Sequence, residues 1–231
     1  MLRRLAPFAA CLILASAAFA QDGDGAPCPE ATFSPRLLTP PALTIPRDAA
    51  LVVGLVDPGT FRALPPVSLV RGRRQTATIE EPIAPGLWRL RPDARRIYGQ
   101  WQLSGVPGAT PLVFGRPGIG PPPIAPRIER VERYIVAGAS GSRTELRAHF
   151  AFPVPETVVA AVLYWGDDAT PDGFAPTVAT AQELVLYQEA GRCPRLPAGG
   201  SAPPASGTVR VAFVGRYGQV SPLSDPARFG D

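Results

Sequence analysis

The side chains that could carry chemistry are few and widely separated. Histidine occurs once, at His149, and the cysteines are Cys11, Cys28 and Cys193. Acid–base and nucleophilic catalysis need at least two reactive groups placed together, and a structural zinc ion needs four ligands. The chain also lacks the GxSxG, HExxH and P-loop motifs. The sequence therefore predicts no catalytic site, no metal site and no cofactor, and we expect a protein that is not an enzyme.

One acidic cluster could bind a cation or a sugar. In the stretch WGDDATPDG, Asp167, Asp168 and Asp172 follow within seven residues of Trp165, and Tyr164 directly precedes that tryptophan. The spacing differs from that of a D-x-D-x-D-G calcium loop, so a polar loop that follows a strand is the simpler interpretation. An aromatic platform for a sugar ring is the sharper hypothesis, and burial of Trp165 in a core is the alternative. These five residues are the candidate ligand-binding set.

The first 20 residues have the layout of a cleaved secretory signal peptide. Arg3 and Arg4 precede an apolar stretch, residues 5–19, and Ala18 and Ala20 frame a cleavage site. A transmembrane anchor is the competing interpretation, but the stretch is shorter than the roughly 20 apolar residues that a bilayer requires. We therefore expect cleavage after residue 20 and a mature chain without a transmembrane anchor. Its expected location is the periplasm, the cell surface or the extracellular medium.

Export also determines the use of the cysteines. Cleavage removes Cys11 and leaves Cys28 and Cys193 as the only thiols. In an oxidising compartment such a pair is most simply a disulfide, with two free thiols or an intermolecular bond as the alternatives. In the chain-entropy model, closing so long a loop stabilises the fold by about 5 kcal/mol. The bond would bring the N-terminal arm toward the second half of the chain.

The charge balance gives little support to a nucleic-acid partner. The signal segment carries two of the 23 basic residues, so the mature chain has 21 basic and 19 acidic residues, a balance of +2. Phosphate backbones are bound by a much larger positive excess. The densest basic group is Arg71, Arg73 and Arg74, where the chain is predicted to turn around Gly72. A solvated turn is one interpretation of this group and an anion-binding patch is the other.

Proline and glycine divide the chain into short extended segments. The sequence holds 30 prolines and 23 glycines, and proline removes a backbone donor and clashes with the preceding turn of a helix. Segments with strand patterns recur about every ten residues between turn-forming groups, which is typical of two-sheet sandwiches. The predicted strands are 42–45, 51–56, 67–70, 75–79, 87–91, 100–104 and 112–114 in the first half, and 127–134, 143–152, 157–165, 183–189, 208–215 and 219 onward in the second.

Two strands of the second half have informative patterns. In RTELRAHFAF the residues Leu146, Ala148, Phe150 and Phe152 share one face, and Glu145, Arg147 and His149 share the other. This alternation predicts a sheet with one solvated face. By contrast, VVAAVLYW at 158–165 is apolar in both phases, which predicts a central strand.

The stretch GRPGIGPPPIAP, residues 115–126, predicts a boundary between two domains. Consecutive prolines favour an extended polyproline conformation, which separates modules and does not pack in a core. The remainder divides into two units of about 100 residues, the usual size of such sandwiches. We expect a flexible N-terminal arm over 21–35, a β-sandwich over 36–114, a linker over 115–126 and a second sandwich over 127–231.

The end of the chain resembles a known family of domains. The stretch VRVAFVGRYGQVSPLSDP, residues 209–226, is similar to the closing hairpin of fibronectin type III-like domains, and residues 127–228 as a whole look like that fold. In the first half, DAALVVGLVD and IYGQWQLSG resemble the Ig-like modules of bacterial envelope proteins. The resemblance implies an all-β protein that serves as a structural or recognition module of the cell envelope, with a protein or another envelope component as partner. The alternative is a secreted carbohydrate- or cation-binding domain that uses loops of the second sandwich.

Overall fold

The described part of the chain is all-β, as the strand patterns predict. A computed structural model describes residues 33–41, 44–61, 63–93, 97–116, 118–138, 141–190, 193–194 and 200–230. Within these ranges the backbone forms sixteen strands and no helix, so none of their elements is a helix that could cross a membrane. The expected signal peptide, Cys28 and most of the expected N-terminal arm lie outside the described residues.

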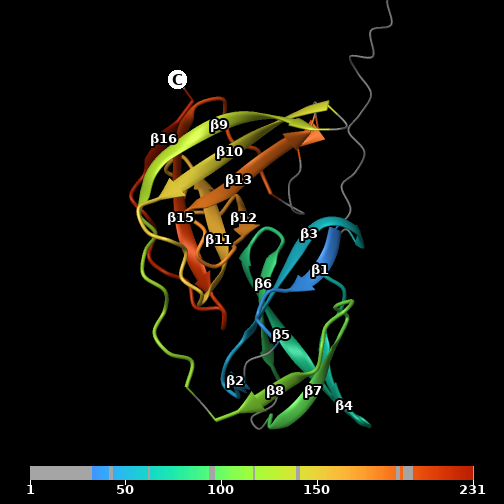
Figure 1. Ribbon diagram of the computed structural model, residues 1–231. Helices are drawn as coiled ribbons and strands as arrows, with labels where there is room; N and C mark the ends of the chain where they lie inside the picture. The colour runs from blue at the N-terminus through green and yellow to red at the C-terminus, as the bar shows by residue number, and fades with distance from the viewer. Residues whose placement is uncertain are drawn as a thin grey trace, which may run out of the picture.

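The first half forms one eight-stranded sheet in the order β1-β3-β6-β5-β4-β7-β8-β2 (Figure 1). Residues 74–77 of β5 pair with β4, and residues 78–84 pair mainly with β6. The strand therefore connects two parts of the sheet, which folds over on itself. The bounds are β1 Phe33–Leu37, β2 Thr44–Pro46, β3 Leu51–Phe61, β4 Ser68–Arg71, β5 Arg74–Ala84, β6 Leu87–Pro92, β7 Gly99–Ser104 and β8 Leu112–Gly115.

The folded sheet encloses the first core. Residues of β2, β3, β4, β6, β7 and β8 meet there, together with residues of the connecting loops. Trp101 belongs to this core, and Trp88 packs against it half-buried. The hairpin predicted around Gly72 is confirmed, because Gly72 has a φ of 57° between β4 and β5. A residue with a β-carbon rarely adopts this left-handed conformation, so the glycine suits the turn.

The second half forms two four-stranded sheets. Their orders are β14-β13-β10-β9 and β12-β11-β15-β16. The strands are β9 Ile128–Gly138, β10 Gly141–Phe150, β11 Val158–Trp165, β12 Gly173–Pro176, β13 Glu183–Ala190, β14 Cys193–Pro194, β15 Gly207–Gly215 and β16 Ala227–Phe229. Inward side chains of both sheets form the second core, in which Phe150 packs edge-on against Phe213 and Trp165 against Phe229.

The alternation predicted for β10 is confirmed at its buried face. Leu146, Ala148 and Phe150 are each at most 4% exposed. Phe152 is 66% exposed, contrary to the prediction, because β10 ends at Phe150 and the chain bends immediately afterwards. The alternation of a strand therefore stops two residues before this phenylalanine.

The two apolar faces of β11 are both buried, against different parts of the molecule. Ala161 and Leu163 face the second core, whereas Ala160 and Val162 belong to a third cluster. This third cluster, which we call the shared core, joins the halves: Val52, Ala84 and Leu87 of the first half pack with Val159, Ala160, Val162, Phe174, Ala212 and Val214 of the second. The second apolar phase of β11 thus packs against the other half of the chain.

Polar contacts reinforce the shared core. The hydroxyl of Thr39 donates to the main-chain oxygen of Arg216 at 2.8 Å and accepts the amide hydrogen of Val52 at 2.8 Å. Gly54 lies so close to Phe174 that an added β-carbon would stand 2.8 Å from the ring. Such approaches require complementary surfaces on both sides. The halves therefore contact each other closely.

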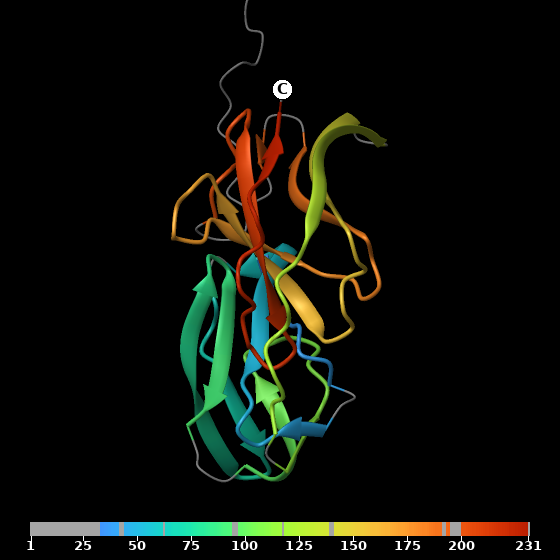
Figure 2. The ribbon, with the colours of Figure 1, turned by 90° about the vertical axis from the view of Figure 1, so that its left-hand side faces the viewer.

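The proline-rich segment 115–126 contacts both halves, whereas the sequence predicted a spacer. The amide of Gly118 donates to Asp48 at 3.3 Å, and the side chain of Gln219 donates to the main-chain oxygen of Ile119. Pro126 is buried. Figure 2 shows the segment running alongside the C-terminal part of the chain before it enters β9. Its extended conformation allows it to lie on the surface of the two halves.

Three short strands lie outside the predicted set. β1 begins at Phe33, within the expected N-terminal arm, and pairs with β3. β12 and β14 contain four and two residues and lie at sheet edges. Cys193 lies in β14, but its side chain is not among the described groups, so the Cys28–Cys193 bond remains a prediction.

Candidate functional site

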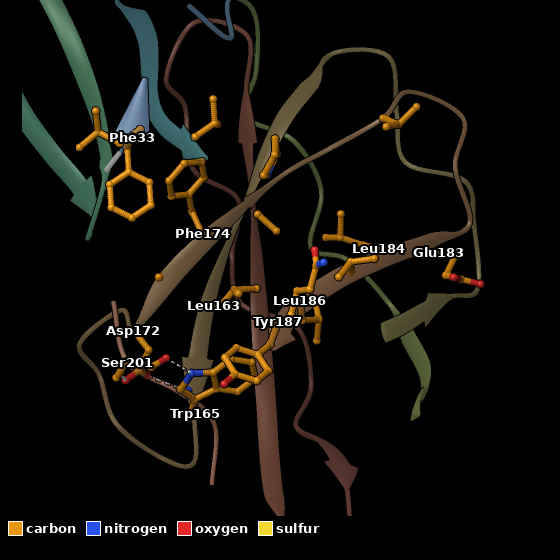
Figure 3. Close-up of a pocket in the computed structure, with 18 residues that line it drawn as sticks. Phe33, Leu163, Trp165, Asp172, Phe174, Glu183, Leu184, Leu186, Tyr187 and Ser201 are labelled. Atoms are coloured by element: carbon orange, nitrogen blue, oxygen red, sulfur yellow. Dashed lines mark hydrogen bonds between the residues drawn. The ribbon is translucent and has the colours of Figure 1, made fainter. Parts of the chain in front are cut away.

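A groove of about 420 Å³ opens between β12 and β13, which belong to facing sheets (Figure 3). We call it the β12 groove. Strands β1 and β3 of the first half line part of it. The residues that line it are Phe33, Leu55, Val56, Leu163, Trp165, Asp172, Gly173, Phe174, Ala175, Pro176, Val178, Glu183, Leu184, Val185, Leu186, Tyr187, Gln188 and Ser201.

The groove exists because the second core is open along one side. β12 ends its sheet after only four residues, and β14, which ends the facing sheet, contains two. Inward residues of β11 and β13, such as Leu163, Leu184 and Leu186, therefore border both the core and the groove. The lining is predominantly apolar, as is usual for small-molecule and peptide sites.

Hydrogen bonds fix one end of the groove. The amide of Trp165 donates to Oδ2 of Asp172 at 2.8 Å, and its indole Nε1 donates to the main-chain oxygen of Ser201 at 3.1 Å. The hydroxyl of Ser201 donates to Oδ1 of Asp172. Figure 3 shows these three residues together at one end, with Phe33 and Phe174 at the other. Both carboxylate oxygens of Asp172 therefore accept hydrogen bonds, one from the end of β11 and one from Ser201.

An exposed apolar residue stands at the rim. Val178 lines the groove and is 69% exposed. Its loop is held by the amide of Thr180, which donates to the main-chain oxygen of Val154 at 2.9 Å. Thr180 has a φ of 64°, which is strained for a β-branched residue. The loop thus keeps Val178 at the mouth of the groove.

The structure separates the five residues predicted to bind a ligand. Trp165 and Asp172 meet at the groove, but Tyr164 points to the opposite face of β11, where burial raises the pKa of its hydroxyl. Asp167 and Asp168 are exposed in the turn after β11. Among the described residues, no group of three His, Cys, Asp or Glu side chains is placed to hold a metal ion.

Sequence reasoning missed a polar network on the solvated face of β9, β10 and β13. His149 lies between two carboxylates, with Nε2 3.3 Å from Glu132 and Nδ1 3.8 Å from Glu183. The hydroxyl of Tyr134 donates to Glu132 and lies 3.1 Å from Nε2 of His149. This bond lowers the pKa of Glu132 and raises that of Tyr134. The side chain of His149 is only 17% exposed, so it is more enclosed than predicted.

The same face holds a buried carboxylate. Glu145 is 2% exposed and pairs with Arg143 at 2.7 Å and with Arg147 at 2.5 Å. Arg147 also binds Glu183 and lies 4.8 Å from the centre of the Tyr134 ring. Its hydrogen bonds to Glu145 and Glu183 raise its pKa further. Polar alternation in two neighbouring strands was the available signal, but it identifies partners only once the register is known.

The predicted arginine group lies far from the groove. Figure 1 places the end of β4 at the end of the molecule away from the C-terminus. Nη1 of Arg71 donates to the main-chain oxygen of Tyr98 at 2.8 Å, and Arg73 and Arg74 are exposed. One arginine of the three thus stabilises the fold, and two form a solvated turn.

Comparisons with known proteins do not assign the chain to a family. No protein-family model matches it, and no curated protein matches its sequence. The geometry of the groove is therefore the main guide to function. A largely apolar groove with aromatic rings at both ends, and with the carboxylates of Asp172 and Glu183 engaged in the fold, is suited to reversible binding of an apolar ligand.

Proposed function

We propose that the chain is an exported, non-enzymatic recognition module of the bacterial cell envelope. It consists of an Ig-like and a fibronectin type III-like β-sandwich connected by residues 115–126, and the disulfide between Cys28 and Cys193 forms in the oxidising compartment. The signal-like N-terminus supports export, and the strand patterns and all-β structure support the sandwiches.

The β12 groove is the observation that carries the proposal. Its volume of about 420 Å³ falls in the range of ligand pockets, and its lining is mostly apolar. The exposed Val178 offers a further apolar contact at the mouth. The groove is formed by strands and by a hydrogen-bonded loop, so it exists before a ligand binds and little ordering entropy is lost.

The polar side chains on the solvated face of β9, β10 and β13 serve the fold. Glu145, Arg147 and Glu183 satisfy one another on the solvated sheet face, and His149 is enclosed by carboxylates there. This pairing supports a non-enzymatic module, because a catalytic group must be accessible to a substrate.

A carbohydrate or cation site at the loops of the second sandwich has less support. Trp165 is 7% exposed and packs edge-on against Phe229, so its ring is not an open stacking platform. Both carboxylate oxygens of Asp172 already accept hydrogen bonds. We therefore propose the groove, and not the loop of Asp167 and Asp168, as the binding surface.

A neutral apolar dye tests the proposal. We expect N-phenyl-1-naphthylamine to bind the folded mature protein saturably, and Val178→Glu to weaken binding about tenfold, because it places a charge beside an apolar ligand. Ile135→Glu is the matched control, since Ile135 is 79% exposed and does not line the groove. Fluorescence titration measures both, with circular dichroism to verify folding. A folded protein that does not bind the dye, or equal losses in the two variants, would contradict the proposed site.

A further inference from the structure

Among the described residues, the groove runs along a strand edge that is open over most of its length. β12 ends its sheet and pairs there with β11 alone, and just before β12 the amide of Ser201 donates to the main-chain oxygen of Asp172 at 2.9 Å. Thr177 extends the same register, since its amide donates to the main-chain oxygen of Val159 at 3.2 Å. Backbone groups of alternate residues in a strand point to the same side. The backbone amides and carbonyls of Ala175 and Thr177 therefore point toward β11. The backbone amide and carbonyl of Phe174 and the carbonyl of Pro176 point to the open edge.

The sides of the groove suit a row of alternate apolar side chains. Trp165 and Phe174 mark its two ends, Leu163 lies between them, and Leu186 and Leu184 of the facing sheet lie to one side of this row (Figure 3). Side chains on one face of a strand are separated by about 7 Å, so successive ones would contact successive parts of this surface. The groove is also continuous with an interface that β3 already makes, because Phe174 belongs to the shared core.

The carboxylates at the groove have partners within the fold. Asp172 accepts hydrogen bonds from Trp165 and Ser201, and Glu183 binds Arg147. The preferred ligand is therefore uncharged where it enters. A peptide can in addition use the backbone groups at the edge of β12.

We propose that the β12 groove binds an extended segment of another polypeptide, which adds as a strand beside β12 and places alternate apolar side chains in the groove. This inference rests on the proposed recognition function and names its partner class. Pro176 has no amide hydrogen and β12 is short, so few backbone hydrogen bonds form and binding is reversible.

A synthetic strand tests the backbone pairing. The probe is the capped heptapeptide Thr-Val-Thr-Val-Thr-Val-Thr, titrated calorimetrically into the mature protein. Two derivatives carry N-methyl groups on all valines or on all threonines, which removes the amide donors from one edge or the other. We expect one derivative to bind about tenfold more weakly and the other to bind like the parent peptide, because only one edge faces β12. Equal effects of the two methylations would overturn the proposal.

A gain in affinity is the second test. Pro176→Ala adds an amide donor at the open edge, and we expect about fivefold tighter binding of the heptapeptide from one more hydrogen bond. Pro121→Ala is the matched control, because Pro121 is also exposed but lies in segment 115–126. A folded Pro176→Ala protein without tighter binding would overturn strand addition.

The outcomes separate this inference from the function on which it rests. Dye binding that Val178→Glu weakens, combined with no heptapeptide binding, would leave the recognition site in place and refute strand addition. Failure of both ligands would refute both. Sedimentation equilibrium of the same samples detects a second copy of the chain in the groove, and a dimer that Val178→Glu dissociates would also overturn the proposal.

Discussion

The two sheets of the second half use their outer faces in opposite ways. The sheet of β9, β10 and β13 has a polar outer face, on which Glu145, Arg147 and His149 pair with neighbours. The sheet of β11 and β15 has an apolar outer face, and Val162 and Val214 there are buried against the first half. Both sheets contribute their inner faces to one core. The outer faces therefore distinguish a sheet that meets solvent from a sheet that meets another part of the chain.

The difference is already present in the periodicity of single strands. β10 alternates apolar and polar residues, whereas β11 is apolar in both phases. An apolar residue on an outer face is costly to leave in water and therefore indicates a covering surface. For β11 that surface is the first half of the same chain.

A charge placed on the apolar outer face gives the largest expected effect. We expect Val162→Asp to lower the free energy of unfolding by at least about 3 kcal/mol, because Val162 is fully buried and the shared core offers the carboxylate no partner. Ile135→Asp, at a 79% exposed position, should cost less than about 0.5 kcal/mol. Urea unfolding measures both. Similar stabilities of the two variants would mean that the halves do not pack together in solution.

Removal of the buried carboxylate from the polar face should cost less. We expect Glu145→Ala to lower the free energy of unfolding by about 2 kcal/mol, because Arg143 and Arg147 lose their partner but are partly exposed and can be hydrated. Glu129→Ala, an exposed carboxylate on β9, is the control and should be nearly neutral. If Glu145→Ala destabilises the protein as much as Val162→Asp does, the expected difference between the polar and the apolar outer face is wrong.

The smallest effect concerns pH. The hydrogen bond from Tyr134 holds the pKa of Glu132 below its ordinary value of 4.5. The carboxylate is thus favoured in the folded state, so its contribution is present above pH 4.5 and is lost as the pH falls through the lowered pKa. We expect Glu132→Gln to reduce the loss of stability between pH 5 and about pH 3. Urea midpoints at both pH values measure it, with Glu156→Gln as an exposed control. An unchanged acid sensitivity would argue against this bond.

Most strands could be predicted from the sequence because their signals are local. Alternation or apolar runs between turn-forming residues place β10, β11 and β15 within two residues of their observed bounds. They place the start of β3 correctly, but β3 continues to Phe61, five residues beyond the predicted end. The short edge strands β12 and β14 carry too few residues for a period, and pairing with a neighbour defines them. The folding of the first sheet through β5 was likewise not predictable, because it depends on two partners of one strand.

The site was predictable only in part. Trp165 and Asp172 were identified from an aromatic residue followed by acids, and both lie at the groove. The sequence did not indicate that the carboxylate of Asp172 accepts hydrogen bonds from the amide of Trp165 and from the hydroxyl of Ser201, which is 29 residues away. Phe33 and Leu55 reach the groove from the other half of the chain, and no local pattern reports such a long-range contact.

The shared core has a consequence for how this architecture can be inherited and engineered. If either half were transplanted into a different protein, Val52 and Leu87 or Val162 and Val214 would lose their cover at once. The transplanted half would then require a host protein with a complementary apolar surface, or it would aggregate through its exposed apolar residues. Recombination that separates the halves within residues 115–126 should therefore give proteins that do not fold. We expect the two halves to be inherited together as one unit.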